Sequence, residues 1–242
     1  MKVVILCGGK GTRLREETEV RPKPMVEIGG RPILWHIMKT YSFHGYRDFI
    51  LCLGYKGEII RSYFNEKAHG EDDWNVTMVD TGLEAMTGAR VKRIEPYIEE
   101  DHFMLTYGDG VTDLDIEALV CFHMSHRKVG TVTGVFPRSI YGELHIEGDR
   151  VRSFDEKPAQ SNHLISGGYF VFNKTLFSYL DDRDSCVLEK DALRRLANDE
   201  ELNVYRHEGF WQCMDTYRDY AFLQDLWKNN RAAWKKWQLI ST

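Results

Sequence analysis

Two kinds of apolar pattern alternate along residues 1–136. Short runs of consecutive apolar residues are typical of strands buried in a parallel sheet. These predicted strands are Lys2–Cys7, Asp48–Leu53, Val76–Asp80, His102–Tyr107 and Thr131–Phe136. Apolar residues at helical spacing lie between them and predict helices at Pro32–His44, Gly57–Lys67, Thr87–Glu95 and Leu114–His126. This alternation predicts an α/β fold with a doubly wound, mostly parallel sheet and helices on both of its faces.

The pattern changes after Phe136. Short strands are predicted at Gly142–Ile146, Arg150–Glu156 and Gly168–Phe172, with a hairpin turn at Gly148–Arg150. Helices return at Leu188–Asn198 and Tyr217–Trp227, and the Lys- and Trp-rich segment Lys228–Trp237 is expected to pack on the surface or on another subunit. We therefore predict a single domain, residues 1–242, whose small β-rich portion in the second half covers the carboxyl ends of the strands. Ligands bind at those ends in open α/β sheets.

Composition narrows the possible partners. The 242 residues carry a net charge of −5, so a general basic surface for nucleic acid is absent. We found no apolar stretch long enough to cross a bilayer and no signal peptide, so we expect no membrane contact and a cytoplasmic location. The five cysteines form no CxxC pair and no zinc-type spacing, which favours reduced thiols.

The segment ILCGGKGTRL, Ile5–Leu14, follows the first predicted strand. A plain glycine-rich turn explains its glycines but not the interleaved cations. A dinucleotide fingerprint requires a third glycine where Leu14 stands, and a P-loop requires a closing Gly-Lys-Ser/Thr that is missing. The remaining interpretation is a loop whose bare amides wrap a phosphate chain, with Arg13 gripping two phosphate oxygens. Lys23 stands between two prolines, which predicts a stiff, extended presentation rather than an ordinary solvated lysine.

These residues carry a family resemblance. GGKGTRL followed by RPKPMVEIGGRPILWH resembles the signature of the sugar-phosphate nucleotidyltransferases, G-G-x-G-T-R-L followed by P-K-P. The stretches WNVTMVDTG, FMLTYGDGVTDLD, VRSFDEKP and GFWQCMDTYRD are most similar to the glucose-1-phosphate cytidylyltransferases, and the resemblance spans nearly the whole chain. It implies a Rossmann-like nucleotidyltransferase fold, with residues 1–136 mainly nucleotide-binding and residues 137–242 contributing the sugar-phosphate site and C-terminal helices.

The resemblance also implies an activity. It indicates transfer of a nucleotidyl group from CTP to glucose 1-phosphate, giving CDP-glucose and pyrophosphate for bacterial polysaccharide synthesis. The same chemistry with UTP or dTTP, or with another sugar 1-phosphate, stays open. A non-catalytic nucleotide sensor would lack one of the expected charged residues, and all are present. An NAD-dependent oxidoreductase is disfavoured by the glycine pattern. A homo-oligomer is possible.

Asp109 stands between two glycines just past a predicted strand, in TYGDG. Gly-Asp-Gly is also good turn chemistry, so an ordinary turn is the alternative. The resemblance implies that Asp109 and Asp215, in QCMDT, hold Mg²⁺, a cation that prefers oxygen ligands. Asp113 and Asp115 are interpreted as the start of the next helix, where negative charge suits the helix dipole.

The remaining site residues follow from the resemblance. Those implied for the nucleotide are Leu6, Gly8, Gly9, Gly11, Thr12, Arg13, Lys23, Thr81, Thr87, Gly88, Arg90 and Gly108. Those implied for the sugar phosphate are Glu156, Lys157, Gly167, Gly168 and Trp211. Structural alternatives are a helix N-cap at Thr87, a charged hairpin end at Glu156, a β-bulge at Gly167 and a core position for Trp211.

The sequence contains no evident pair of nucleophile and base. We therefore expect direct in-line displacement, in which catalysis is positioning and charge stabilisation. The predicted catalytic side chains are Arg13, Lys23 and Lys157.

Overall fold

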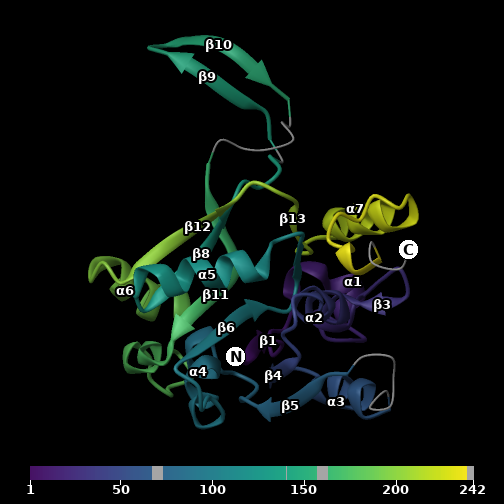
Figure 1. Cartoon of the computed structure of the whole chain (residues 1–242). Coiled ribbons are helices and arrows are strands. Elements are labelled where there is room, and N and C mark those ends of the chain that lie inside the picture. Colours follow the sequence, from purple (N-terminus) through teal and green to yellow (C-terminus); the bar gives the residue numbers. More distant parts are fainter. Residues whose placement is uncertain (67–72, 140, 157–162, 239–242) are drawn as a thin grey trace.

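The computed structural model describes residues 1–66, 73–139, 141–156 and 163–238 (Figure 1). A seven-stranded sheet forms its centre, in the order β12-β8-β11-β6-β1-β4-β5. In sequence order these are β1 Val3–Leu6, β4 Asp48–Leu53, β5 Asn75–Asp80, β6 His102–Tyr107, β8 Gly130–Val135, β11 Ile165–Asn173 and β12 Leu202–His207. Only β11 runs antiparallel to its neighbours β6 and β8, and the other pairings are parallel. The predicted doubly wound, mostly parallel sheet is confirmed.

Two apolar clusters cover the two faces of this sheet. Successive side chains of a strand point to opposite faces, so Val3 and Ile5 join one cluster, and Val4 and Leu6 join the other. The first cluster includes residues of α2 Ile33–Phe43, α3 Gly57–Glu66, α5 Ile116–His126 and α7 Tyr217–Lys228. The second includes residues of α4 Thr87–Arg93, the 3₁₀ helix η4 Lys174–Tyr179, the π-helical turn η5 Leu188–Leu193 and α6 Arg194–Asn198. Asp115 caps α5 by accepting a hydrogen bond from the Ala118 amide, as its predicted position implies.

The second half of the chain contributes both to the main sheet and to small sheets. The strand predicted at Gly168–Phe172 is the centre of β11, whereas β12 was not predicted, because its half-exposed side chains give no apolar run. The small antiparallel pairs are β2 Glu27–Ile28 with β3 Arg31–Pro32, β7 Gly110–Thr112 with β13 Trp211–Cys213, and β9 Glu143–Glu147 with β10 Arg150–Asp155.

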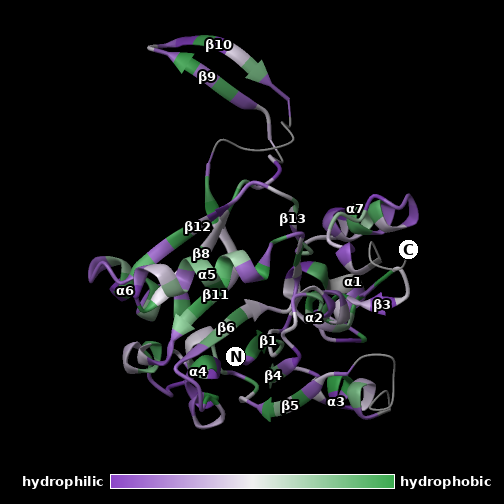
Figure 2. Ribbon diagram, in the orientation of Figure 1, coloured by the Kyte–Doolittle hydropathy of each residue, from purple (hydrophilic) through white to green (hydrophobic). Residues whose placement is uncertain are grey.

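The β9–β10 hairpin projects away from the body of the molecule (Figure 1). Leu144 lies opposite Phe154 and Ile146 lies opposite Val151, so the four side chains share one face. Each is between 55% and 69% exposed, and Figure 2 shows hydrophobic positions on both strands. An isolated two-stranded hairpin is at best marginally stable in water, so this apolar face is a candidate contact surface.

The segment Lys228–Trp237 packs on its own chain. Trp234 is 1% exposed and its indole nitrogen lies 3.4 Å from Nδ1 of His36, in α2. Trp227 packs edge-on against the same imidazole, with ring centroids 4.9 Å apart. The prediction that this segment packs on the surface or on another subunit is therefore wrong for Trp234, which packs in the core of its own chain. Within the described residues, no helix is long and apolar enough to cross a membrane.

Two buried imidazoles make stability depend on pH. Burial is the main cause that lowers the pKa of His36 and of His123 from 6.5 to about 4. For His123 the neighbouring charges of His102 and His126 lower the pKa further. Both side chains thus stay neutral in the folded state at a pH where the unfolded chain binds protons. The contribution of the two imidazoles to the free energy of unfolding is complete above pH 6.5. It is lost as the pH falls towards 4, by up to about 1.4 kcal/mol per pH unit for each group.

Urea denaturation across this pH range tests the effect. We expect the free energy of unfolding of the wild type to fall steeply below pH 6.5. His123→Gln is expected to be less stable at neutral pH, because the hydrogen bond between the imidazole and the Thr131 hydroxyl is lost. Its free energy of unfolding is expected to decline less than that of the wild type as the pH falls. An equal decline in both proteins would contradict the assignment to His123.

Candidate active site

The loop after β1 and the turn after β6 leave the sheet side by side. Leu6 of β1 pairs with Tyr107 of β6 in parallel register. Gly8 and Gly108 therefore start their loops at the same carboxyl edge, and the Gly108 amide donates to the Leu6 carbonyl over 3.1 Å. The phosphate-type loop and the predicted metal ligand Asp109 are thus brought together by the register of two adjacent strands.

Glycine is required at two points of the loop for different reasons. A Cβ atom on Gly8 would lie 2.1 Å from Nη1 of Arg90, so only glycine lets this guanidinium approach. Gly11 has φ +62°, a left-handed conformation that side chains disfavour. Gly9 is exposed, and no atom lies within 4 Å of a virtual Cβ on it, so a ligand can approach the backbone at this point. The loop is therefore shaped by Gly8 and Gly11 and stays accessible at Gly9.

Lys23 is buried between two carboxylates. It opens a short 3₁₀ turn, Lys23–Met25, so the extended presentation predicted from its flanking prolines is wrong. The Met25 amide closes the turn by donating to the Pro22 carbonyl over 2.8 Å. Nζ of Lys23 donates to Oδ2 of Asp109 and to Oδ1 of Asp215, each over 2.6 Å. One ammonium thus joins the two aspartates that the sequence assigned to a metal.

Asp215 reaches this point through a strand pairing that is distant in sequence. Cys213 of β13 pairs with Gly110 of β7, and the Met214 amide donates to the Asp109 carbonyl over 2.8 Å. Arg13 approaches from the loop, with Nη2 at 2.9 Å from Oδ1 of Asp215. The cluster therefore combines two carboxylates with two cations.

The charges of the cluster hold one another ionised. Burial alone raises the pKa of Asp215, but the hydrogen bond and charge of Lys23, together with Arg13, bring that pKa below its ordinary value. Burial alone lowers the pKa of Lys23, and the charge of Asp109 with the hydrogen bonds of both aspartates raises that pKa above its ordinary value. At neutral pH the ammonium is therefore a stable cation between carboxylates.

The same side chains fit a divalent cation. One donor atom each of Asp109, Cys213 and Asp215 lies within 4.8 Å of the other two. Carboxylate oxygens suit a hard cation such as Mg²⁺. The position of the Lys23 ammonium, 2.6 Å from both carboxylates, indicates that positive charge is stabilised there.

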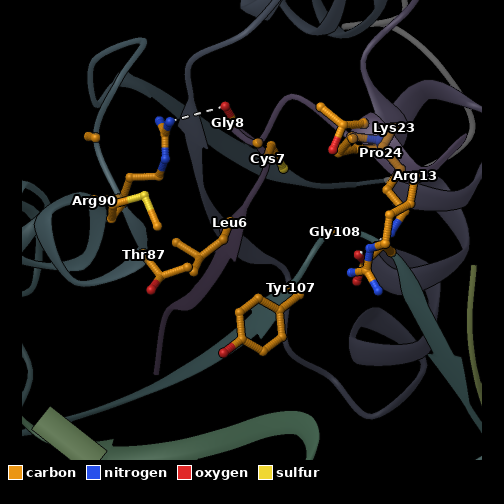
Figure 3. A pocket seen from close by; sticks show the side chains of 16 residues that line it. Leu6, Cys7, Gly8, Arg13, Lys23, Pro24, Thr87, Arg90, Tyr107 and Gly108 are labelled. Atoms are coloured by element: carbon orange, nitrogen blue, oxygen red, sulfur yellow. Dashed lines mark hydrogen bonds and ion pairs between the residues drawn. The ribbon is translucent and has the colours of Figure 1, made fainter. Parts of the chain in front are cut away.

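Two cavities meet at this cluster. The first, about 310 Å³, is drawn in Figure 3. Its lining is Leu6, Cys7, Gly8, Gly9, Gly11, Thr12, Arg13, Lys23, Pro24, Ala85, Met86, Thr87, Arg90, Tyr107, Gly108 and Asp109. The second, about 340 Å³, is lined by Arg13, Thr106, Tyr107, Asp109, Gly110, Ile165, Ser166, Gly167, Gly168, Tyr169, Trp211, Cys213 and Asp215. Arg13, Tyr107 and Asp109 belong to both linings, so two ligands can meet at these three side chains.

Most residues predicted for the nucleotide line the first cavity, and Thr81 and Gly88 do not. Thr81 is 1% exposed and its hydroxyl donates to the Leu53 carbonyl over 2.7 Å. A Cβ atom on Gly88 would lie 2.6 Å from Sγ of Cys186, so glycine there permits α4 to pack closely on that segment. For both residues the structure shows a packing role, and a nucleotide contact of either one stays a prediction. Thr87 begins α4 and is not its N-cap, which is Met86.

Arg90 lines the first cavity, but its donors serve the protein. Nη1 donates to the carbonyl of Leu53 and to the hydroxyl of Thr81, over 3.0 and 2.9 Å. Nη2 donates to the carbonyl of Gly8 over 3.0 Å, the contact marked in Figure 3. The guanidinium therefore fixes the start of the loop after β1 by its bond to Gly8, and a contact of Arg90 with the nucleotide stays a prediction.

Arg90→Met is expected to destabilise the protein by about 2–4 kcal/mol, because buried carbonyl groups lose charged donors. Chemical denaturation measures this loss. Arg93→Met is the matched control on the same helix, since Arg93 is half-buried and bonds carbonyl oxygens nearer the surface. A loss for Arg90→Met no larger than for Arg93→Met would contradict the role given to Arg90.

On the sugar side, three predicted residues line the second cavity. Trp211 is half-buried and donates from its indole nitrogen to the Gly167 carbonyl over 2.8 Å. Gly168 has φ +76°, and the register between β11 and β8 shifts between Ser166 and Phe170, so the alternative reading as a bulge is confirmed. Glu156 is exposed after β10 and lines neither cavity, and Lys157 lies outside the described residues.

Sequence reasoning missed Tyr107 and Glu189. The Tyr107 hydroxyl donates to Oε1 of Glu189, and the Thr87 hydroxyl donates to Oε2 of Glu189 over 2.7 Å. Burial, and then the Glu189 carboxylate, raise the pKa of Tyr107, so its phenol stays protonated. The position of Tyr107 directly before Gly108–Asp109 was a usable signal, whereas Glu189 gave none.

A mostly parallel α/β sheet with a glycine-rich loop, a cation and paired carboxylates at its carboxyl edge defines a phosphate-handling transferase. A model of the nucleotidyl transferase family matches residues 2–233, and the chain therefore belongs to that family of enzymes. Glucose-1-phosphate cytidylyltransferase of Salmonella typhi is 49% identical over an alignment 258 positions long. The alignment covers 98% of this chain and 100% of that protein. A Bacillus subtilis (strain 168) protein named as a probable glucose-1-phosphate cytidylyltransferase is 40% identical, with 98% of this chain and 100% of the relative covered. The solved structure of HddC from Yersinia pseudotuberculosis superposes with a TM-score of 0.73 at 26% identity, covering 93% of this chain and 98% of that one.

Proposed function

We propose that the chain transfers a cytidylyl group from CTP to glucose 1-phosphate, with release of pyrophosphate. The observation that carries the proposal is the junction of two cavities at Arg13, Asp109 and Tyr107, beside the Lys23–Asp215 contact. Relatives at 40% and 49% identity that carry the cytidylyltransferase name support CTP and glucose 1-phosphate as the substrates. The first cavity would take the nucleotide and the second the sugar phosphate.

The reaction is an in-line displacement. A phosphate oxygen of glucose 1-phosphate forms a bond to the α-phosphorus of CTP, and the bond from that phosphorus to the bridging oxygen of the β-phosphate breaks. Pyrophosphate leaves with the electron pair, and the attacking phosphate is already an anion, so no base is required. The side chains of the site therefore act by holding two anions in line.

Each charged side chain has a distinct part in this step. The backbone around the exposed Gly9 and the Arg13 fork would bind the leaving phosphates. Asp109 and Asp215 would hold Mg²⁺, which supplies neutralisation of phosphate charge when bound. Lys23, whose ammonium contacts both carboxylates, would hold the triphosphate. Lys157 and Glu156 stay predicted ligands of the sugar phosphate.

Pyrophosphate release with glucose 1-phosphate and Mg²⁺ tests the function. CTP, UTP and dTTP are supplied separately, and the product is identified by mass spectrometry. We expect CTP to give the highest kcat/KM. Turnover with UTP or dTTP but not CTP would instead support the alternative substrate pair, and binding without turnover of any triphosphate would support the sensor.

We also propose that the chain forms a homo-oligomer through the β9–β10 hairpin, because the apolar side chains Leu144, Ile146, Val151 and Phe154 are exposed on one face. Light scattering after gel filtration is expected to give a mass above that of one chain. The double variant Leu144→Lys/Phe154→Glu is expected to shift the mass towards the monomer, whereas Glu143→Lys should not. A wild-type monomer would contradict this proposal.

The cytoplasmic location expected from the sequence stays a prediction.

A further inference from the structure

Tyr107 is a wall shared by the two cavities. Its side chain lines both of them, at the carboxyl end of β6. One edge of the ring packs on Gly168, where a Cβ atom would lie 2.6 Å from Cδ2 of the tyrosine. The hydroxyl of the same side chain donates to Glu189 in the π-helical turn η5. The ring is thus fixed between the second cavity and a residue outside both.

Glu189 connects Tyr107 to a second residue that lines the first cavity. Its other carboxylate oxygen accepts a hydrogen bond from Thr87, which lines the first cavity at the start of α4. The Thr87 hydroxyl in turn accepts a hydrogen bond from the Leu188 amide over 3.0 Å, so the orientation of the hydroxyl is determined from both sides. Figure 3 shows Thr87 and Tyr107 as neighbours along the same part of the pocket wall.

We infer that Glu189 is a positioning residue that sets the placement of the two substrates relative to each other. This inference rests on the proposed function. The Glu189 carboxylate lines neither cavity, so it acts by holding Tyr107 and Thr87. We call Glu189, Tyr107 and Thr87 the tyrosine clamp. Two anions must be aligned for in-line attack, and small displacements of a positioning group lower the rate strongly. The π-helical turn carrying Glu189 is a type of irregularity that often occurs at functional sites.

The clamp is tested by kinetics. Glu189→Ala is expected to lower kcat/KM by about tenfold, through a lower kcat together with a rise in KM for both CTP and glucose 1-phosphate, since Tyr107 borders both cavities. Glu189→Gln should remain within about threefold of the wild type, because the amide still bonds both hydroxyls. Glu58→Gln, an exposed glutamate in the first turn of α3, is the matched control and should be unchanged.

A double-mutant cycle separates positioning from general destabilisation. If Glu189 acts through its partners, Glu189→Ala in a Tyr107→Phe/Thr87→Val background adds less than about twofold. Fully additive losses would overturn the inference. So would a lower kcat with both KM values unchanged and a reduced melting temperature, because that pattern indicates loss of folded enzyme.

Failure of the clamp can be told from failure of the function. Wild-type protein that forms no CDP-glucose contradicts the proposed function alone. The clamp is then tested with the triphosphate that binds most tightly in calorimetry. Weaker binding by Glu189→Ala than by Glu58→Gln supports the clamp, and equal binding overturns it.

Discussion

Replacing Asp215 by asparagine is expected to lower kcat for pyrophosphate release on the order of 10³-fold while the protein stays folded. Asparagine keeps the size of the side chain but removes the charge that the divalent cation would need. Lys23 keeps Asp109 as a partner at 2.6 Å, so no buried cation is left unpaired. Asp109→Asn should have an effect of the same size, for the same reason.

The measurement combines steady-state kinetics with titration of Mn²⁺ by calorimetry in the absence of substrates. Both variants should bind the cation more weakly than the wild type. Asp101→Asn, an exposed aspartate before β6, is the matched control. The assignment of Asp109 and Asp215 as metal ligands fails if either variant binds Mn²⁺ as tightly as the control. It also fails if either variant keeps more than about a tenth of the kcat of the control.

Arg13→Ala is expected to lower kcat by about 10²- to 10³-fold without a measurable change in the free energy of unfolding. The Arg13 side chain is 71% exposed, so its removal leaves the core intact. It borders both cavities and reaches Asp215 over 2.9 Å, which places a positive charge where the leaving phosphates would lie. Arg13→Lys should recover part of the rate, because lysine restores the positive charge. Recovery should be incomplete, because the ammonium lacks the planar fork of the guanidinium.

Lys10→Ala is the matched control for this loop. Lys10 is an exposed cation three residues before Arg13, and its ammonium pairs with Glu84 over 2.8 Å. Its removal changes the net charge of the loop by the same amount. If Arg13→Ala and Lys10→Ala lowered kcat equally, the effect would come from the general field and Arg13 would have no specific contact.

Local pattern predicted the elements that carry the first cavity well. β1 and β6 follow from short apolar runs, and the parallel register of their ends makes Gly8 and Gly108 neighbours. The glycines around Asp109 left an ordinary turn and a ligand both open, and the family resemblance favoured the metal. The pairing of β1 with β6 that brings Asp109 to the loop after β1 comes from the structure. Asp215 entered only through the family resemblance, since the pairing of β13 with β7 that delivers it joins segments far apart in sequence.

Arg90 and Glu189 show where such reasoning ends. A guanidinium after a Thr-Gly pair fits a ligand contact as well as a buried support. The choice depends on the carbonyls of Leu53 and Gly8, which only the folded chain supplies. Glu189 stands in an irregular π-helical turn and contacts the site through other side chains, so neither spacing nor charge pattern reveals it.

The contact of Trp234 with His36 makes the packing of an early helix depend on a segment much later in the chain. The two residues are 198 positions apart, and the tryptophan joins the apolar cluster that contains α2. Contacts between segments so far apart form only after the entropic cost of closing a long loop has been met. We therefore expect the packing of Trp234 on α2 to belong to the slow, non-local part of folding.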